Sequence, residues 1–119
     1  NYIMSKINLN ISISDFMKID IRKGEIIDAK PFPEARKPAY RLLIDFGKDL
    51  GIKKSSAQIT ENYKIHNLIG FSVLAVVNLP PRQVGPFISE VLILGFNDKL
   101  NKIILVESPS SIKIGERLH

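Results

Sequence analysis

Apolar and polar residues alternate along several short stretches of the chain, a pattern that predicts β-strands. The clearest stretch is YRLLIDF, residues 40–46, in which every second residue is a large apolar one or a tyrosine. This period of two is typical of a strand that is buried on one side. Residues 71–79, FSVLAVVNL, are apolar at almost every position instead, which predicts a central strand buried on both sides.

The first predicted strand is long and has a glycine in its interior. It covers residues 19–32, and Ile19, Ile21, Ile27 and Ala29 are expected to share one face, with Gly24 between the two pairs. A glycine inside a strand pattern usually marks a bulge or a sharp bend. We therefore expect this strand to bend near its middle, so that it can serve two faces of a small barrel.

The rest of the pattern predicts short elements that are separated by turn residues. These elements are a helical turn over 14–17 capped by Ser14 or Asp15, a strand over 50–59, a helix of one to three turns between an N-cap at Thr60 and Gly70, hairpin strands over 89–96 and 101–108 around Asn97-Asp98-Lys99, and a short final strand within 112–119.

The order of these elements favours one fold class. Three strands, one short helix and two or three further strands match the oligonucleotide-binding (OB) fold, an all-β, five-stranded barrel with a helix after the third strand. An SH3-like barrel would lack the helix, and a ferredoxin-like fold would need two substantial helices. We predict a single OB domain over residues 14–119 with short terminal extensions, the first of them over residues 1–13.

Composition narrows the class of protein further. The chain has 119 residues, 45% of them hydrophobic, and a formal net charge of +5. Such a charge fits either an acidic partner, such as a nucleic acid, or simply a solvated basic surface. No apolar run approaches the roughly 20 residues that span a bilayer, and no signal peptide is visible. We expect a cytoplasmic protein whose natural start is Met4, with residues 1–3 as an addition.

Candidate chemistry is sparse in this sequence. The chain has no cysteine and only two histidines, His66 and His119, so we expect no disulfide and no metal site. Paired carboxylates, a nucleophile elbow and phosphate-binding glycine motifs are also missing from the sequence. We therefore expect no enzymatic activity and no cofactor.

Basic residues gather in two predicted binding segments. The loop over 31–41 is stiffened by prolines and carries Arg36 and Lys37, and residues 53–60 combine two lysines with hydroxyl and amide groups. Each segment could equally be a connection with solvated charges. Phe87 and Tyr63 are the rings that we expect to be exposed, while Phe46, Phe71 and Phe96 are expected in the core. So few stacking rings favour the backbone and shape of a folded RNA over a single strand.

Four segments, DFMKIDIRKGEI, FPEARKPAYRLLIDFG, GIKKSSAQIT and VVNLPPRQVGPFISEVLILG, together resemble the CsaA proteins, a group within the tRNA-binding-domain family. Asn78, Pro81, Arg82 and Ser89 match the loop-to-strand motif of the broad family. Val91-Leu92 replaces the Gly-Met of that family and Phe32-Pro33 replaces its His-Pro, and both departures are typical of the CsaA group.

The resemblance implies an OB-fold homodimer that is not an enzyme and that binds folded tRNA with little sequence preference. It also implies an alternative function as a chaperone that holds unfolded precursor proteins and cooperates with the secretion ATPase. For RNA, the expected phosphate contacts are Arg36, Lys37, Lys53, Lys54 and Arg82, and the expected hydrogen-bonding groups are Ser55, Ser56, Gln58, Asn78 and Ser89. For polypeptides, the expected groove is lined by exposed Phe32, Phe87 and Ile88.

Overall fold

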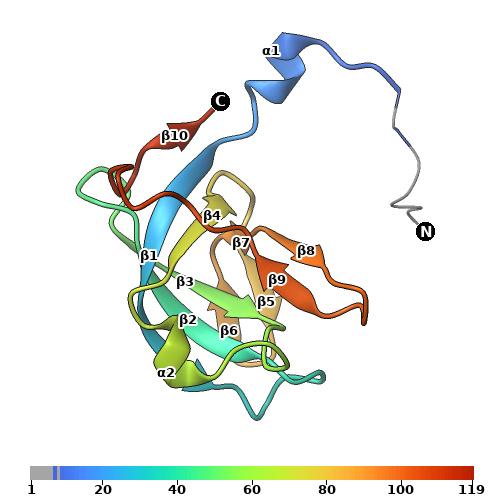
Figure 1. Cartoon of the computed structure of the whole chain (residues 1–119), viewed down its shortest axis with the longest axis vertical. Helices are drawn as coiled ribbons and strands as arrows, with labels where there is room; N and C mark the ends of the chain where they lie inside the picture. The colour runs from blue at the N-terminus through green and yellow to red at the C-terminus, as the bar shows by residue number, and fades with distance from the viewer. Residues whose placement is uncertain (1–6, 8) are drawn as a thin grey trace.

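The computed structural model of the chain describes residues 7 and 9–119 (Figure 1). Most of the predicted extension over residues 1–13, namely residues 1–6 and 8, lies outside this part. The helices and strands are α1 (Ile13–Phe16), β1 (Ile21–Pro31), β2 (Tyr40–Asp45), β3 (Ile52–Ala57), α2 (Ile65–Leu68), β4 (Ser72–Val76), β5 (Arg82–Val84), β6 (Phe87–Ser89), β7 (Leu92–Ile93), β8 (Gly95–Asn97), β9 (Ile103–Leu105) and β10 (Arg117–Leu118).

The strands form the predicted five-stranded barrel. Antiparallel neighbours follow the order β3-β2-β1-β4-β7, and β10 pairs with the beginning of β1. Two small ribbons, β5–β6 and β8–β9, complete the β-structure, and α2 lies between β3 and β4 in the sequence, as the OB fold requires. The long strand β1 serves both halves of the barrel, because residues 21–25 pair with β4 and residues 25–31 pair with β2.

Gly24 allows close packing and does not form the predicted bulge. The register between β1 and β2 shifts between Ile26 and Asp28 instead. As a result Ile26 is fully buried and Ile27 is 38% exposed, so the prediction that Ile27 shares a face with Ile21 and Ala29 is wrong. Ile19 does not share that face either, because it lies before the beginning of β1 and is 41% exposed. A Cβ atom at Gly24 would lie 2.5 Å from Cγ2 of Ile44 and 2.7 Å from Cε1 of Phe46. Only glycine therefore fits where the bent strand crosses these two side chains.

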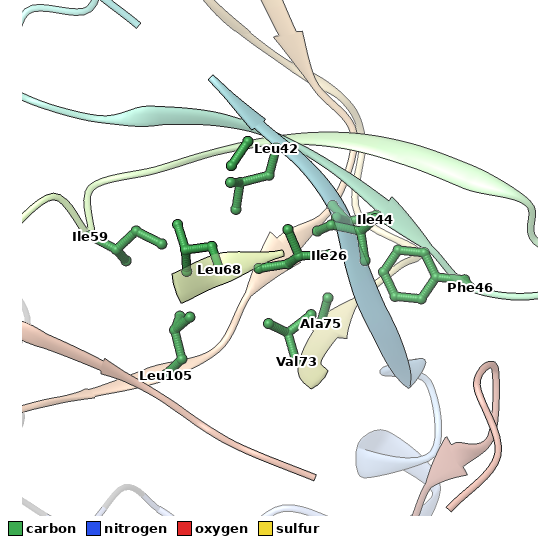
Figure 2. Close-up of a cluster of buried hydrophobic side chains, with 11 residues drawn as sticks. Ile26, Leu42, Ile44, Phe46, Ile59, Leu68, Val73, Ala75 and Leu105 are labelled. Carbon is green, nitrogen blue, oxygen red and sulfur yellow. The ribbon is translucent and has the colours of Figure 1, made fainter. Parts of the chain in front are cut away.

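The core sits inside the barrel, as Figure 2 shows. Leu42, Ile44 and Phe46 are buried on alternate positions of β2 and just after it, which confirms the period-two prediction for residues 40–46. Val73 and Ala75 of β4 complete the opposite wall, and both are fully buried. Burial of large aliphatic side chains contributes roughly 1.5–3 kcal/mol each to folding.

Both helices begin at other residues than the pattern predicts. The N-cap of α1 is Ser12, whose side chain accepts a hydrogen bond from the backbone of Asp15. Helix α2 begins after Lys64 and not after Thr60. The preceding segment turns instead toward β9, where Asn62 Nδ2 donates to the Ile103 carbonyl and Tyr63 Oη accepts from the Leu105 N–H. Side chains of this loop thus bond backbone groups at the edge of β9, and the helix begins only after these residues.

The predicted hairpin around residues 97–99 is present, but its apolar residues are not all buried. Phe96 of β8 lies opposite Ile104 of β9, and the two are 68% and 40% exposed. The expectation that Phe96 belongs to the core is therefore wrong. The hairpin lies on the outside of the barrel, and its outer face has no packing partner in the described part of the chain.

The C-terminal segment is fixed to the beginning of β1 by a buried lysine. Lys23 is 4% exposed, and its Nζ donates to the carbonyl groups of Pro109 and Ile112 at 2.8 and 2.6 Å. Close by, Arg22 Nε donates to Asp20 at 2.6 Å, and this contact lowers the pKa of the Asp20 carboxyl. These contacts place the predicted final strand, β10, beside β1.

We expect Gly24→Ala to lower the free energy of unfolding by about 1–3 kcal/mol, because the added methyl group overpacks the core. The measurement is urea denaturation of the variant and the wild type. Gly70→Ala is a comparison without overpacking, because no atom lies within 4 Å of the added Cβ, and its loss of stability reports only the strain of alanine at a φ of +86°. A variant at Gly24 that is as stable as the wild type would refute the close-packing explanation.

Candidate nucleic-acid interface

A cleft of about 1060 Å³ opens on the side of the barrel where β3 approaches β7. Its rim consists of loop residues 34–37, the end of β3 with the residues that follow it, and the β5–β6 hairpin, while β7 to β9 supply its inner wall. Half of the residues predicted for RNA contact line this cleft. They are Arg36, Lys37, Ser56, Gln58 and Arg82.

Local sequence explains why the basic groups meet there. The loop after β1 turns back at once, with the Ala35 N–H bonded to the Phe32 carbonyl, and prolines on either side restrict its backbone. The hairpin turns at Gly85, which has a φ of +56°, and its register places Arg82 opposite Ser89. Among the described residues that line the cleft, three carry cationic side chains and one, Glu34, carries a carboxylate, so the cleft attracts anions.

Ser55 and Ser89 have a structural role in closing the barrel between β3 and the segment before β7. The Ser56 N–H donates to Ser89 Oγ at 3.1 Å, and Ser55 Oγ donates to the Val91 carbonyl at 3.2 Å. Nearby, Glu90 exchanges two 2.8 Å bonds with the backbone of Lys54. Ser55 is 1% and Ser89 8% exposed. Both hydroxyls already have protein partners, so their contact with RNA stays a prediction.

Asn78 and Lys53 lie outside the cleft as well. The Asn78 amide accepts from the Asp20 N–H at 3.0 Å and donates to the Lys18 carbonyl at 2.7 Å. It thereby ties the end of β4 to the segment that precedes β1. Lys53 is half-buried on β3, opposite Ile44. The structure therefore places neither residue beside Arg82.

Lys54 belongs to a row of aromatic and cationic side chains next to the hairpin. Its Nζ lies 5.4 Å from the ring centre of Phe87. The Phe87 and Phe32 rings pack edge to face, with their centres 5.5 Å apart. The Arg41 guanidinium lies 5.6 Å from the Phe32 ring centre. Phe32 is only 3% exposed, so the expectation of an accessible ring is wrong because Arg41 and Phe87 cover it.

The other predicted contact residues differ in accessibility. Ile88 is 43% exposed, as expected, and Phe87 is half-buried. Tyr63 is not a free stacking ring, because it is half-buried against Phe71 at 5.7 Å and its hydroxyl is used at the edge of β9. Ile88 and part of Phe87 are therefore accessible from solvent, whereas the Tyr63 ring and hydroxyl are engaged by the protein.

The structure adds an apolar wall that the sequence patterns did not assign to the site. Val84, Leu92 and Ile93 line the cleft, and Leu92 is 51% exposed. In the chain, Leu92 stands at the second position of the Val-Leu departure from the Gly-Met motif, while Val91 is 6% exposed and contributes to the core. The methionine that the motif has at this position is also large and apolar, so the signal available in the sequence was the apolar residue at position 92 itself and not the departure from the motif.

A small barrel of OB topology with a basic cleft at its open side is the architecture of a nucleic-acid-binding domain. The chain belongs to the tRNA-binding-domain family, because the family model described as "Putative tRNA binding domain" matches residues 21–117. Among proteins of known structure, it is similar to the CsaA chaperone protein of Picrophilus torridus, with 47% identity, a TM-score of 0.86, and coverage of 92% of this chain and 100% of the other.

Two further proteins extend this comparison. The chaperone CsaA of Bacillus anthracis is 42% identical with a TM-score of 0.86, over 93% of this chain and 100% of the other. A methionine–tRNA ligase from Parabacteroides distasonis is 32% identical over 120 residues, which are 99% of this chain and 17% of the ligase. The predicted resemblance to the CsaA group is thus confirmed, and the chain spans about one sixth of the ligase.

The comparisons assign the family, and the structure bears on two further expectations. No helix in the described part of the chain has the length and apolar content that a membrane crossing requires. Within the same residues, His, Asp and Glu side chains form no group of three or more that could hold a metal ion.

We expect Ser89→Ala to lower the free energy of unfolding by about 1–2 kcal/mol, because the Ser56 N–H loses its acceptor at a buried position. Urea denaturation measures this change, with Ser110→Ala on the exposed C-terminal loop as the control. If Ser89→Ala weakens RNA binding while the free energy of unfolding stays unchanged, Ser89 is a contact residue and not a part of the barrel closure.

Proposed function

We propose that the protein is a non-catalytic, homodimeric tRNA-binding protein of the cytoplasm that holds folded tRNA in its basic cleft with little sequence specificity. The observation that carries this proposal is the convergence of Arg36, Lys37 and Arg82 on one cleft, in a chain of the tRNA-binding-domain family. Segments far apart in the sequence supply these charges, so their meeting is a property of the fold.

The chemistry of the cleft favours contact with the RNA backbone. Arg36, Lys37 and Arg82 are exposed and positioned to neutralise phosphates, while Ser56 and Gln58 can bond phosphate or ribose oxygens. The described residues that line the cleft include no aromatic ring on which a base could stack. Recognition through phosphates and shape gives little sequence preference, as expected for a folded RNA.

Exposed apolar side chains support the homodimer. Ile7, Leu9, Ile11 and Ile13 are between 68% and 99% exposed, and α1 stands away from the barrel in Figure 1. An alternating row of large aliphatic side chains is costly to leave in water. A second copy of the chain would cover this row and would present two basic clefts to one large RNA.

A second function, chaperoning, is favoured by the apolar wall of the same cleft. Val84, Leu92 and Ile93 face the basic rim, an arrangement that suits an extended apolar segment flanked by polar groups. The similar structures from Picrophilus torridus and Bacillus anthracis are described as CsaA chaperones. Unfolded precursor proteins, delivered to the secretion ATPase, are the partners that we propose for this function, with Ile88 and Phe87 beside the cleft.

We expect Lys37→Gln and Arg82→Gln each to weaken tRNA binding and to reduce the slope of log K against log salt by about one, because each removes one phosphate contact. Filter binding between ~50 and 200 mM salt measures both effects. Lys99→Gln, a matched charge change on the distant hairpin turn, should leave both values unchanged.

The wild type provides the decisive comparison for this proposal. An absence of tRNA affinity at low salt, or an affinity that does not change with salt, would overturn it. Light scattering on the same samples reports the molar mass of the free protein, and a mass of one chain would contradict the homodimer.

For the chaperone function we expect the purified protein to suppress aggregation of a chemically unfolded protein on dilution, and Leu92→Ser to reduce that suppression several-fold. The physical reason is the loss of apolar contact area at the cleft wall. Leu100→Ser, which alters an exposed leucine outside the cleft, is the control. Equal suppression by both variants would show that the cleft does not hold the polypeptide.

A further inference from the structure

A second, smaller hollow lies on the outer face of the barrel, separate from the basic cleft. It encloses about 190 Å³ and is lined by Asp28, Lys30, Arg41, Leu42, Leu43 and Phe87. None of these residues lines the cleft. The volume is below the roughly 300–1,000 Å³ of pockets that enclose a whole small molecule. The hollow therefore fits a single ring or side chain of a larger ligand.

The register of β1 and β2 builds this hollow. Asp28 lies opposite Leu43 and Lys30 lies opposite Arg41. Arg41 and Leu43 occupy the positions of β2 that alternate with the buried core residues, so they belong to its outer face. Phe87 of β6, on the hairpin that also forms the rim of the cleft, supplies the remaining wall.

The aromatic wall is held in place by its neighbours. Phe32 contacts the Phe87 ring at a centroid distance of 5.5 Å and an interplanar angle of 62°, and Lys54 Nζ lies 5.4 Å from the same ring. A ring that is already fixed loses little side-chain entropy when a ligand stacks on it. Phe87 is therefore a preorganised stacking surface that is partly exposed to solvent.

Polar groups beside this wall offer both donors and an acceptor. The Arg41 guanidinium rests over Phe32 and forms no ion pair with any residue of the described chain. The Asp28 carboxylate is 43% exposed and only loosely paired with Lys30, at 3.8 Å. A ligand in the hollow thus meets an aromatic wall, the aliphatic side chain of Leu43, hydrogen-bond donors and one strong acceptor.

We propose that this hollow binds one unpaired nucleobase of the tRNA whose backbone lies in the cleft. Phe87 stacks on the base, Asp28 accepts a hydrogen bond from an exocyclic amino group, and Arg41 donates to a base oxygen or ring nitrogen. The proposal rests on the tRNA-binding function proposed above. A base fits better than an apolar peptide side chain, because a base can bond the donors and the acceptor together and belongs to a polyanion that Lys30, Arg41 and Lys54 attract.

The hollow can be tested without tRNA by NMR titration of the full chain with adenosine and cytidine 5′-monophosphates. We expect saturating shifts of the Leu43 methyl groups and the Phe87 ring, with smaller shifts at Leu92 in the cleft. Leu43→Phe fills the hollow from the outer face of the sheet and should abolish the shift of the Phe87 ring, which is the reporter that this variant keeps. Ile52→Phe adds the same ring to an exposed site on β3 and should preserve the shifts of Leu43 and Phe87.

Binding of tRNA separates the two proposals. We expect Leu43→Phe and Phe87→Leu to weaken tRNA binding at least about fivefold, as the loss of one base–aromatic stack predicts. Their affinity for a blunt RNA duplex and their salt slope should equal those of the wild type. If the wild type instead shows the monophosphate shifts but a tRNA affinity that does not change with salt, the proposed binding of tRNA in the cleft is contradicted and the proposed base-binding hollow is not.

Two results would overturn the base-binding hollow. One is the absence of monophosphate shifts at Leu43 together with unchanged tRNA affinity of both variants. The other is a response of the Leu43 methyl groups to N-acetyl-phenylalanine amide but not to either monophosphate, which would identify a subsite for a peptide side chain. Circular dichroism spectra and thermal unfolding show whether the barrel is intact in each variant. If either Leu43→Phe or Phe87→Leu is misfolded, the tRNA affinity of the other variant decides the test.

Discussion

The barrel depends on the close approach of Gly24 to the side chains of Ile44 and Phe46. At this point β1 passes from its pairing with β4 to its pairing with β2, and any side chain larger than hydrogen would separate the strand from the core. The next residue toward the N-terminus, Lys23, is buried and bonds the C-terminal segment. Lys23 and Gly24 together thus fix the point at which β1 passes from β4 to β2 and the position of the C-terminal segment.

The binding surface arises from the way in which the barrel closes. Between β3 and the segment before β7, side chains of Ser89 and Glu90 replace part of a regular ladder of backbone hydrogen bonds. This closure brings the β5–β6 hairpin against β3 and leaves the cleft beside it. One hairpin therefore separates two sites, the basic cleft on one side and the hollow behind Phe87 on the other. Movement of the hairpin would change both sites together.

The period-two pattern was sufficient to predict β2, because one buried face is a local property of the sequence. The single strand predicted over 89–96 is instead divided into the end of β6, β7 and the beginning of β8. The role of Gly24 was not predictable from the pattern, since a bulge and a close approach both require glycine. The late start of α2 was missed for another reason. Asn62 and Tyr63 bond β9, which lies about 40 residues further along the chain, and such distant partners are not visible in a local cap motif.

The candidate site was predictable in part for similar reasons. Exposed cations on stiff loops, such as Arg36 and Arg82, line the cleft as predicted, because a charged side chain on a surface loop stays in solvent whatever the rest of the fold does. Hydroxyl and amide groups are different, because Ser55, Ser89 and Asn78 can bond a ligand or the protein equally well. In this structure they bond the protein. The apolar wall at Leu92 became visible only when β7 was placed beside the cleft.

The tying of the C-terminal segment to the start of β1 has a consequence for domain architecture. In Figure 1, α1 and β10 lie at one end of the barrel, and the loop between β1 and β2, which carries Arg36 and Lys37, lies at the other. A further domain that was joined to the barrel after β10 would lie at the end of the barrel opposite to the loop with Arg36 and Lys37. The barrel can therefore work as a modular unit, which agrees with the occurrence of a similar segment as about one sixth of a methionine–tRNA ligase.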